Sequence, residues 1–173
     1  MWIAESDATL VNPARALPWG VTERDQWIVV SISSGTLVAY RGSRAVYATL
    51  ISPGAGGIPR RGQDPVKQST TPLGIYRITF KLRDTTMSPE HGEHRKFWIA
   101  DVPHTQYFNA PFALHAAYWH DAFGEPMSAG CINLSPIDAE WLFAWTEPRV
   151  PPEWNGAAPS ELTGRGTFVV VVR

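Results

Sequence analysis

The sequence predicts a mainly β fold, a mixed β-sandwich or sheet with a short helix that follows the loop carrying the only cysteine. Three observations lead to this fold class. Runs of β-branched and aromatic residues, separated by short turns rich in Gly and Ser, fill residues 26–51. Residues 166–172 form a continuous apolar run that is typical of a central strand. The clearest helix signal comes after the cysteine, from Ser135 onward.

The composition is that of an ordinary globular protein. A chain of 173 residues suits one well-packed domain, and 44% hydrophobic against 18% charged residues argues against disorder. A formal net charge of -1, from 15 basic and 16 acidic residues, does not favour a nucleic-acid partner. The 8 Trp residues indicate a large aromatic core or, alternatively, a face that binds carbohydrate or peptide.

The sequence does not indicate in which compartment the protein acts. No stretch is apolar enough to cross a membrane, and residues 1–7 lack the basic and then apolar pattern of a signal peptide. A signal removed from this chain, another export route and a cytoplasmic location all stay open. The lone cysteine excludes an intrachain disulfide but says little about the compartment.

The first part of the chain divides into a lead-in and a meander. We expect residues 1–25 to form an irregular lead-in that packs on a single domain of residues 26–173. Short Gly/Ser turns join the β-rich runs that follow, which favours an antiparallel meander. The three runs are residues 26–32, 36–40 and 44–51.

Two segments are predicted to be loops. Residues 52–70 are rich in Gly and Pro and form either a flap over a cleft or a solvated surface loop, and we favour the surface loop. In the flap interpretation, three basic side chains meet substrate carboxylates: Arg60, Arg61 and Lys67. Residues 83–95 contain His91 and His94, whose spacing suits a metal site on a helix, but Gly92 between them favours a solvated loop.

Three further strands are expected before the cysteine. Residues 75–80 alternate between apolar and polar side chains, and residues 96–102 are rich in apolar and aromatic residues. Residues 112–116 form a short apolar run that carries His115 to the end of a sheet.

The helix after the cysteine is predicted from its capping residues. Ser135 suits the N-cap, Pro136 the first helical turn and Asp138 the capping-box position. Proline residues beyond position 147 end the helix. Four apolar residues are predicted to form its buried face: Ile137, Trp141, Leu142 and Trp145. The helix then clamps the cysteine loop against the core.

Cys131, the only cysteine, lies in the run Ser128-Ala129-Gly130-Cys131-Ile132-Asn133. A lone cysteine is often a small buried hydrophobe. As a nucleophile it needs a neighbouring base, because the thiolate is the reactive form, and the candidates upstream are His115 and His120. Small residues before Cys131 let another molecule approach, and leave the N–H groups of Gly130 and Cys131 free to point at an oxyanion.

Two motifs resemble the L,D-transpeptidase catalytic domain, the YkuD family. His115, a spacer containing Gly124, and Ser-x-Gly-Cys-Ile-Asn over residues 128–133 are similar to the family's pattern of His, spacer, Ser/Thr-His-Gly-Cys, a hydrophobic residue and Asn or Arg. Residues 71–76, Thr-Pro-x-Gly-x-Tyr, are similar to a second family motif, a turn that leads into a strand. The family's His before Gly-Cys is Ala129 here, which removes an imidazole from the loop but leaves the upstream base in place.

The resemblance implies a role for each site residue. Cys131 is the nucleophile and His115 is its base, held by the backbone carbonyl of Ala116, whereas His120 lacks the strand placement of the family's base. The N–H groups of Gly130 and Cys131 hold the oxyanion. Five residues are expected to contact the substrate or support the loop: Tyr107, Tyr118, Trp119, Ser128 and Asn133. No metal and no organic cofactor are implied.

In function, the resemblance implies an L,D-transpeptidase that acts on bacterial peptidoglycan stem peptides. Cys131 forms a thioester, releases D-Ala and passes the acyl group to an amine, which gives a cross-link or another amide. The partners are a tetrapeptide donor and an amine acceptor. The expected setting is a monomer in the periplasm or at the cell wall, with a role in cell-wall biogenesis and cell shape.

Three alternatives stay open. An L,D-carboxypeptidase or peptidoglycan hydrolase effector of the same fold uses water in place of the amine. An inactive peptidoglycan-binding relative is kept open by Ala129. A metal-dependent hydrolase would use three histidines: His91, His94 and His120.

Overall fold

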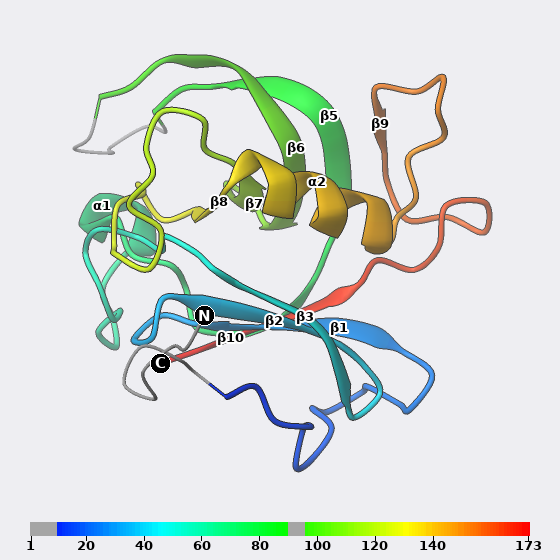
Figure 1. Cartoon of the computed structure of the whole chain (residues 1–173). Coiled ribbons are helices and arrows are strands. Elements are labelled where there is room, and N and C mark those ends of the chain that lie inside the picture. Colours follow the sequence, from blue (N-terminus) through cyan, green and yellow to red (C-terminus); the bar gives the residue numbers. More distant parts are fainter. Residues whose placement is uncertain (1–9, 90–95) are drawn as a thin grey trace, which may run out of the picture.

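Two β-sheets, stacked as layers, form the body of the molecule (Figure 1). The computed structural model describes residues 10–89 and 96–173, and within them each sheet has five strands. The first sheet has the strand order β3-β2-β1-β10-β4, and the second has the order β8-β7-β6-β5-β9. The predicted fold class, a mainly β sandwich with a short helix after the cysteine loop, is confirmed.

The first sheet joins strands from both halves of the chain. β1 (Gln26–Ser31), β2 (Thr36–Arg41) and β3 (Arg44–Leu50) pair antiparallel as the predicted meander. β10 (Phe168–Val172) runs parallel to β1 and antiparallel to β4 (Gly74–Arg77). The apolar run at the end of the chain is therefore a central strand, as predicted, because strands pair with both of its edges.

The second sheet carries the predicted base. Its strands are β5 (Phe80–Met87), β6 (Ile99–Asn109), β7 (Phe112–Ala116), β8 (Ile132–Leu134) and β9 (Gly156–Ala157). β7 has the predicted bounds, and it lies parallel to β8 with His115 opposite Asn133. Parallel neighbours need a long connection, and here the connection contains the cysteine loop. The chain thus returns beside the base directly after Cys131.

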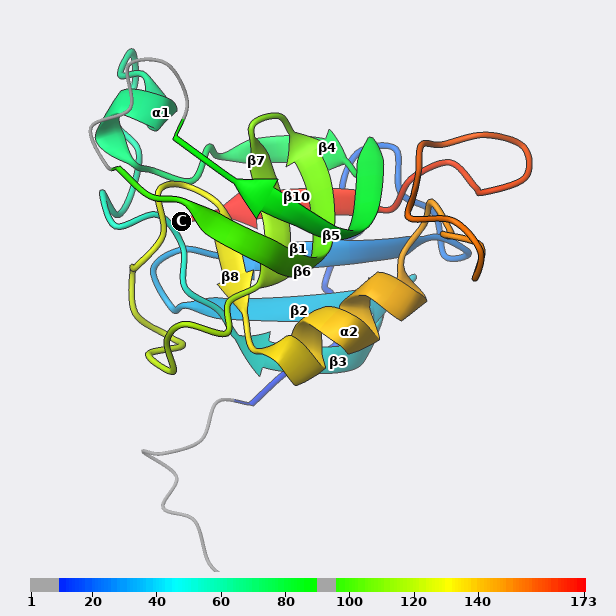
Figure 2. The same ribbon diagram turned by 90° about the horizontal axis from the view of Figure 1, so that it is seen from above.

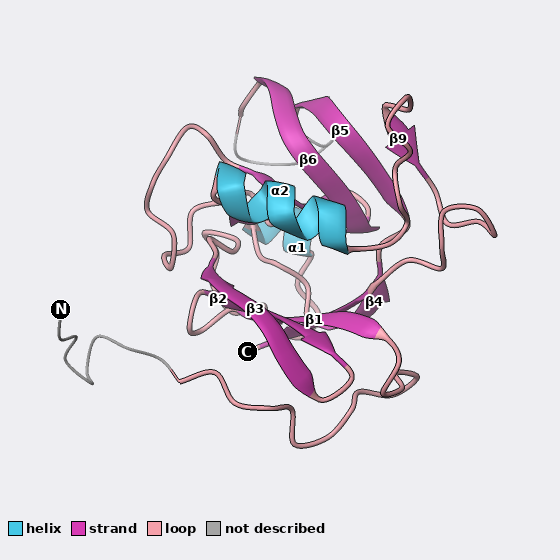
Figure 3. Ribbon diagram, turned by 45° about the vertical axis from the view of Figure 1, so that its right-hand side comes forward, coloured by secondary structure: helices cyan, strands magenta, loops and turns pink. Residues whose placement is uncertain are grey.

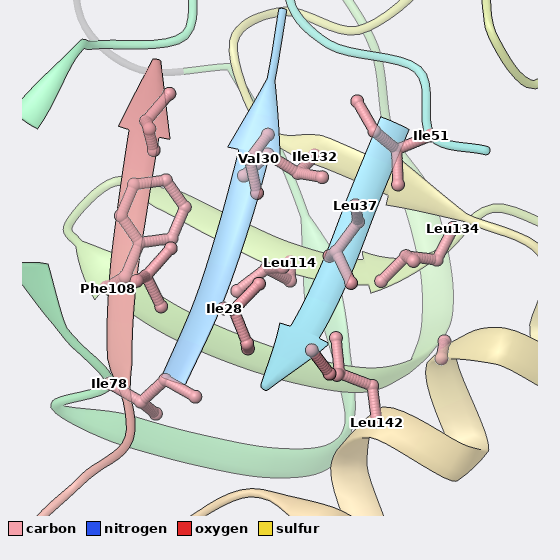
Figure 4. Packing of buried hydrophobic residues seen from close by; sticks show 14 of the residues in the cluster. Ile28, Val30, Leu37, Ile51, Ile78, Phe108, Leu114, Ile132, Leu134 and Leu142 are labelled. Atoms are coloured by element: carbon pink, nitrogen blue, oxygen red, sulfur yellow. The ribbon is translucent and has the colours of Figure 1, made fainter. Parts of the chain in front are cut away.

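The core lies between the sheets, where alternate residues of the strands point inward (Figure 4). Side chains from both sheets and from the helix after the cysteine, α2 (Pro136–Trp145), meet in one cluster. Its fully buried or nearly buried members include Ile28, Val30, Leu37, Phe108, Leu114, Ile132, Leu134 and Leu142. Burying one aliphatic side chain is worth roughly 1.5–3 kcal/mol, so this cluster is the main force that holds the two layers together.

The outer face of the first sheet is covered by the lead-in. Trp27 and Tyr40 stack there with ring centroids 4.6 Å apart. Residues 10–25 form neither helix nor strand, and Ala14 and Leu17 pack against this aromatic cluster. The remainder of the predicted lead-in lies outside the described residues.

Helix α2 begins at the predicted N-cap and is tied to the first sheet. Ser135 Oγ accepts a hydrogen bond from the N–H of Asp138 at 3.2 Å. The Asp138 carboxylate accepts hydrogen bonds from the hydroxyls of Tyr47 at 2.7 Å and Thr49 at 2.8 Å, both on β3. The helix lies along one side of the sandwich and packs against β6, β7 and β8 (Figures 2 and 3).

The predicted buried face of α2 was wrong in part. Leu142 is buried, but Ile137 is 78% exposed. The other buried positions are Ala139 and Phe143. Side chains two positions apart in an α-helix point in directions that differ by about 200°. A helix that turns Ala139 toward the core therefore turns Ile137 away from it. Trp141, also on the predicted face, is half-buried and stacks on Tyr47 with ring centroids 3.9 Å apart.

Four predicted segments also differ from the structure. The strand expected at residues 75–80 is split, because β4 joins the first sheet and β5 joins the second. β5 continues to Met87, in residues predicted to be a loop, because pairing with β6 extends it. The strand expected at residues 96–102 is the first part of β6, which begins at Ile99 and continues to Asn109. The loop predicted at residues 52–70 contains a one-turn helix, α1 (Pro65–Gln68), capped by the Asp64 side chain.

Candidate active site

A strip of backbone, residues 52–55, holds the cysteine loop in place. Pro53 O accepts a hydrogen bond from Ser128 N at 3.0 Å. Ser52 and Asn133 exchange two backbone hydrogen bonds, at 2.9 and 3.0 Å. The strip follows β3 along the chain, so the first sheet positions both ends of the loop that contains Cys131.

Within the loop, Ser128 closes a tight turn before Cys131. Its Oγ donates to Cys131 O at 2.5 Å and accepts from Gly130 N at 3.0 Å. Ser128 is buried, so this hydroxyl supports the loop from inside. The expectation that the N–H of Gly130 is left free was wrong, because Ser128 accepts it. The part of this N–H in an oxyanion hole stays a prediction.

Gly130 occupies a position that excludes a side chain. Its φ is +130°, and an added Cβ would lie 2.5 Å from Phe112 Cε1. Its carbonyl accepts a hydrogen bond from Thr71 Oγ1 at 2.9 Å, and Thr71 Oγ1 in turn accepts one from Gly54 N at 2.9 Å. Thr71 belongs to the Thr-Pro-x-Gly-x-Tyr motif, so that motif ties the strip to the cysteine loop.

The His115 ring is buried and held in one orientation. Its Nδ1 lies 2.9 Å from Ala116 O, which is the contact expected of this carbonyl. Burial lowers the pKa of His115 to about 4; the hydrogen bond to Ala116 opposes this shift, and the nearby His120 adds to it. The imidazole is therefore neutral near neutral pH, with Nδ1–H donated to Ala116 and Nε2 as the basic nitrogen.

Two clefts meet at Cys131. The larger has a volume of about 430 Å³, and its walls include Tyr107, Pro111 and Phe112. The smaller has a volume of about 130 Å³, and its walls include His115, Trp119, Ser128 and Asn133. Four residues line both clefts: Met87, Phe97, Ala129 and Cys131. The predicted nucleophile thus lies where two clefts join, and Ala129 stands at the same junction.

The predicted substrate contacts divide between these clefts and the surface. Tyr107 lines the larger cleft, and Trp119 lines the smaller with its ring centroid 5.8 Å from that of His115. Tyr118 is absent from the walls of both clefts, and its hydroxyl donates to Ala100 O at 2.7 Å. The part of Tyr118 in substrate binding stays a prediction.

His120, the alternative base, does not line either cleft. It is half-buried, and its Nε2 lies 2.9 Å from Asn133 Nδ2. Burial lowers the pKa of His120, and Asp121 opposes the shift. The geometry favours His115 over His120 as the base of Cys131, because only His115 lines a cleft that Cys131 shares.

Sequence analysis missed two residues that line both clefts, Met87 and Phe97. Met87 ends β5, and Phe97 lies two residues before β6. Residues 83–95 were predicted to be a loop, and the Thr-Thr-Met run at residues 85–87 was the signal available for a strand there. Thr71 was expected only to start a turn, and its hydrogen bond to the cysteine loop needs the folded chain.

The described residues contain no cluster of side chains that would support the metal-dependent alternative. Among residues 10–89 and 96–173, no three His, Cys, Asp or Glu side chains gather closely enough to hold a metal ion. His91 and His94, which the metal hypothesis used, lie outside these residues. In the same part of the chain, no helix has the length and apolar character needed to cross a membrane.

Sequence comparison decides the family. A family model described as the L,D-transpeptidase catalytic domain, YkuD, matches residues 25–171. The chain belongs to the YkuD family. A curated relative, YciB of Bacillus subtilis (strain 168), is provisionally named an L,D-transpeptidase; it is 22% identical over 128 residues, which are 71% of this chain and 62% of YciB.

Solved L,D-transpeptidase structures share the fold. One from Mycobacterium smegmatis superposes with a TM-score of 0.62 at 18% identity, covering 86% of this chain and 59% of that one. LdtMt1 in complex with imipenem superposes with a TM-score of 0.61 at 21% identity, covering 85% of this chain and 58% of LdtMt1. A Cys-to-Ser mutant from Enterococcus faecium gives 0.60 at 20%, covering 86% and 50%. This YkuD chain thus spans less than two thirds of the length of each of these relatives.

Proposed function

We propose that the protein is an L,D-transpeptidase that modifies peptidoglycan stem peptides through a thioester on Cys131. Membership of the YkuD family supports a peptidoglycan-related transpeptidase. The observation that carries the proposal is the position of Cys131 at the junction of two clefts, one of which it shares with the oriented imidazole of His115. A transferase that forms a covalent intermediate needs access for two substrates at one nucleophile.

The first half-reaction transfers the stem peptide to the enzyme. His115 Nε2 takes the proton of the Cys131 thiol as the sulfur attacks the carbonyl carbon before D-Ala. The C–S bond forms, the C–N bond to D-Ala breaks, and His115 returns the proton to the departing amine. The lowered pKa of His115 keeps the imidazole unprotonated and ready as the base at neutral pH.

The second half-reaction releases the acyl group. An amine attacks the thioester, its proton passes to His115, and the C–S bond breaks as the new amide forms. Cys131 then regains its proton. Attack by water instead of the amine gives a free tripeptide, which is the carboxypeptidase outcome. We assign the donor peptide to the larger cleft and the amine to the smaller, because only the larger has the volume for several residues.

Intact-mass spectrometry tests this proposal. The protein is incubated with imipenem and, separately, with a disaccharide-tetrapeptide that ends in D-Ala. The wild type is expected to gain one adduct, Cys131→Ala to gain none, and His115→Ala to react about 10²–10⁴-fold more slowly. His104→Ala is the matched control, because His104 is a partly buried histidine on β6 that lines neither cleft.

The products separate the two enzyme classes. Release of D-Ala with a cross-linked dimer identifies a transpeptidase, and release of D-Ala with free tripeptide identifies a carboxypeptidase. A wild-type protein that forms no adduct with either compound would overturn the enzyme proposal and favour the inactive binding relative, for which Ala129 is the distinguishing residue.

We also propose that the protein acts as a monomer at the cell wall or in the periplasm, where stem peptides are found. Light scattering coupled to gel filtration measures the first point, and fractionation of cells that express the complete gene measures the second. A stable dimer, or recovery in the cytoplasmic fraction alone, would contradict the respective statement.

A further inference from the structure

His120 reaches the smaller cleft through one neighbour, Asn133. The ring nitrogen Nε2 of His120 lies 2.9 Å from Asn133 Nδ2. Asn133 is 3% exposed, lines the smaller cleft together with Cys131, and stands opposite His115 in the parallel pair β7–β8. Paired residues of neighbouring strands place their side chains on the same face of a sheet. Asn133 therefore lies beside the proposed base, and His120 contacts Asn133.

The short contact defines where the proton of His120 lies. An amide nitrogen only donates, so Nε2 must accept, and the proton of the neutral ring is on Nδ1. Both His120 Nδ1 and Asn133 Oδ1 are buried without a hydrogen-bond partner among the described residues. If the amide turned by half a rotation, Oδ1 would accept from a protonated Nε2. The proton on His120 and the orientation of the Asn133 amide are thus coupled.

Aromatic rings and two titratable groups surround His120. Its ring centroid lies 4.9 Å from that of Phe123 and 6.3 Å from that of Trp119. Asp121, next in the same loop, interacts with it electrostatically, and so does His115 on β7. Asn133 on β8 is uncharged. A proton gained by His120 therefore places a positive charge near the imidazole that must itself become positive during acylation.

We propose that His120 is a positioning residue, which in its neutral form fixes the Asn133 amide beside His115 and, when protonated, turns that amide and opposes proton uptake by the base. This inference rests on the proposed function, because it concerns the acylation of Cys131. As the pH falls, the rate of acylation is then lost through protonation of His120, at a higher pH than that at which His115 itself is protonated.

The pH profile of acylation distinguishes this role from a structural one. The rate of imipenem adduct formation is measured between about pH 5 and pH 8, the range in which a histidine titrates. In His120→Gln, the side-chain carbonyl still accepts from Asn133 Nδ2 but takes no proton, so the acid limb is expected to move to lower pH. His120→Ala is expected to slow acylation about tenfold, the equivalent of one lost hydrogen bond, and His120→Gln to restore most of that loss.

Two further variants complete the design. His104→Gln makes the same change at a histidine whose Nδ1 is also buried without a partner among the described residues, but which lines neither cleft, and it should leave the acid limb in place. In an Asn133→Ala background, His120→Gln should cause a smaller shift than in the wild type, since the amide that it positions is gone and only the direct charge effect on His115 remains. An unchanged acid limb in His120→Gln, or equal rates in His120→Gln and His120→Ala, would overturn the proposal.

A spectroscopic readout keeps this test independent of catalysis. In ¹⁵N-labelled protein, the side-chain NH₂ resonances of Asn133 should follow the titration of His120, and should lose that pH dependence in His120→Gln. Absence of any adduct would overturn the proposed function and with it the assigned effect on acylation, whereas Asn133 resonances that ignore the His120 titration would overturn the inference alone.

Discussion

Lys81 on β5 and His115 on β7 are both buried basic residues of the second sheet, and their surroundings differ in one respect. Burial lowers the pKa of Lys81 to about 7 and that of His115 to about 4. Lys81 Nζ donates to Phe143 O at 2.5 Å and to both Thr146 O and Thr146 Oγ1 at 3.0 Å. Three acceptors match the three N–H groups of an ammonium, so the Lys81 group is saturated.

His115 Nδ1 lies in a fixed contact with Ala116 O, and the His115 ring also lines the cleft that contains Cys131. A saturated polar group holds structure, and a group that keeps a nitrogen for the cleft can exchange a proton with a substrate. Under the proposed function, burial in one sheet serves two purposes. Lys81 anchors the end of α2, since Thr146 is its C-cap, while Asp138 anchors the beginning.

The largest expected effect comes from His115→Gln. Glutamine keeps a polar side chain but cannot take the thiol proton, so acylation of Cys131 should fall by about 10²–10⁴-fold. The free energy of unfolding should change by only about 1–2 kcal/mol, the value of one hydrogen bond. Rapid-mixing mass spectrometry gives the first number and urea unfolding gives the second. A fall in stability without a fall in acylation would reverse the comparison.

Lys81→Met should show the opposite pattern. Methionine has a similar length but leaves the carbonyls of Phe143 and Thr146 without a donor, and the expected loss is about 2–3 kcal/mol of unfolding free energy. At a temperature where the variant is folded, its rate of acylation by imipenem should stay within about threefold of the wild-type rate, as expected of a substitution that does not affect the site. A parallel loss of acylation would mean that the end of α2 controls the cysteine loop.

This comparison also shows what the sequence could predict. The start of α2 and the bounds of β7 were predicted correctly, because an N-cap such as Ser135 and a short apolar run are local signals. The burial of Lys81 could not be predicted, since Phe-Lys-Leu-Arg is also the pattern of a strand with its lysine in water. Its acceptors lie 62 and 65 residues away, and only the packing of α2 brings them together.

The candidate site divides in the same way. Cys131 and His115 were predicted from the resemblance of their motif to the L,D-transpeptidase pattern, and their catalytic roles stay predictions. The amide of Gly130 was misjudged because its partner, the hydroxyl of Ser128, depends on the turn that the loop adopts. Thr71 and Met87 were missed, because each reaches the cysteine loop or the clefts from another part of the chain.

Thr71→Val tests whether a side chain whose hydrogen bonds are all made also holds structure beside Cys131. Valine keeps the shape of threonine but leaves Gly54 N and Gly130 O without their shared partner, so a loss of about 1–2 kcal/mol in unfolding free energy is expected. Because the cysteine loop would also be less well held, acylation should slow by about threefold to tenfold. Thr79→Val is the control, since Thr79 is exposed and bonds only weakly, at 3.2 Å, to Tyr107 O. Equal effects of the two variants would contradict the role given to Thr71.

The smallest expected effect is the pH dependence that Lys81 gives to stability. The folded pKa of Lys81 is about 7 against an ordinary value of 10.5, so between these values the unfolded chain binds more protons than the folded protein. Stability should therefore rise with pH across this window, by about 1 kcal/mol between about pH 7 and pH 8 from this residue alone. Urea unfolding of the wild type and of Lys81→Met, taken as a difference, isolates that contribution. If the difference is flat, the three acceptors keep the buried ammonium charged, and saturation outweighs desolvation at Lys81.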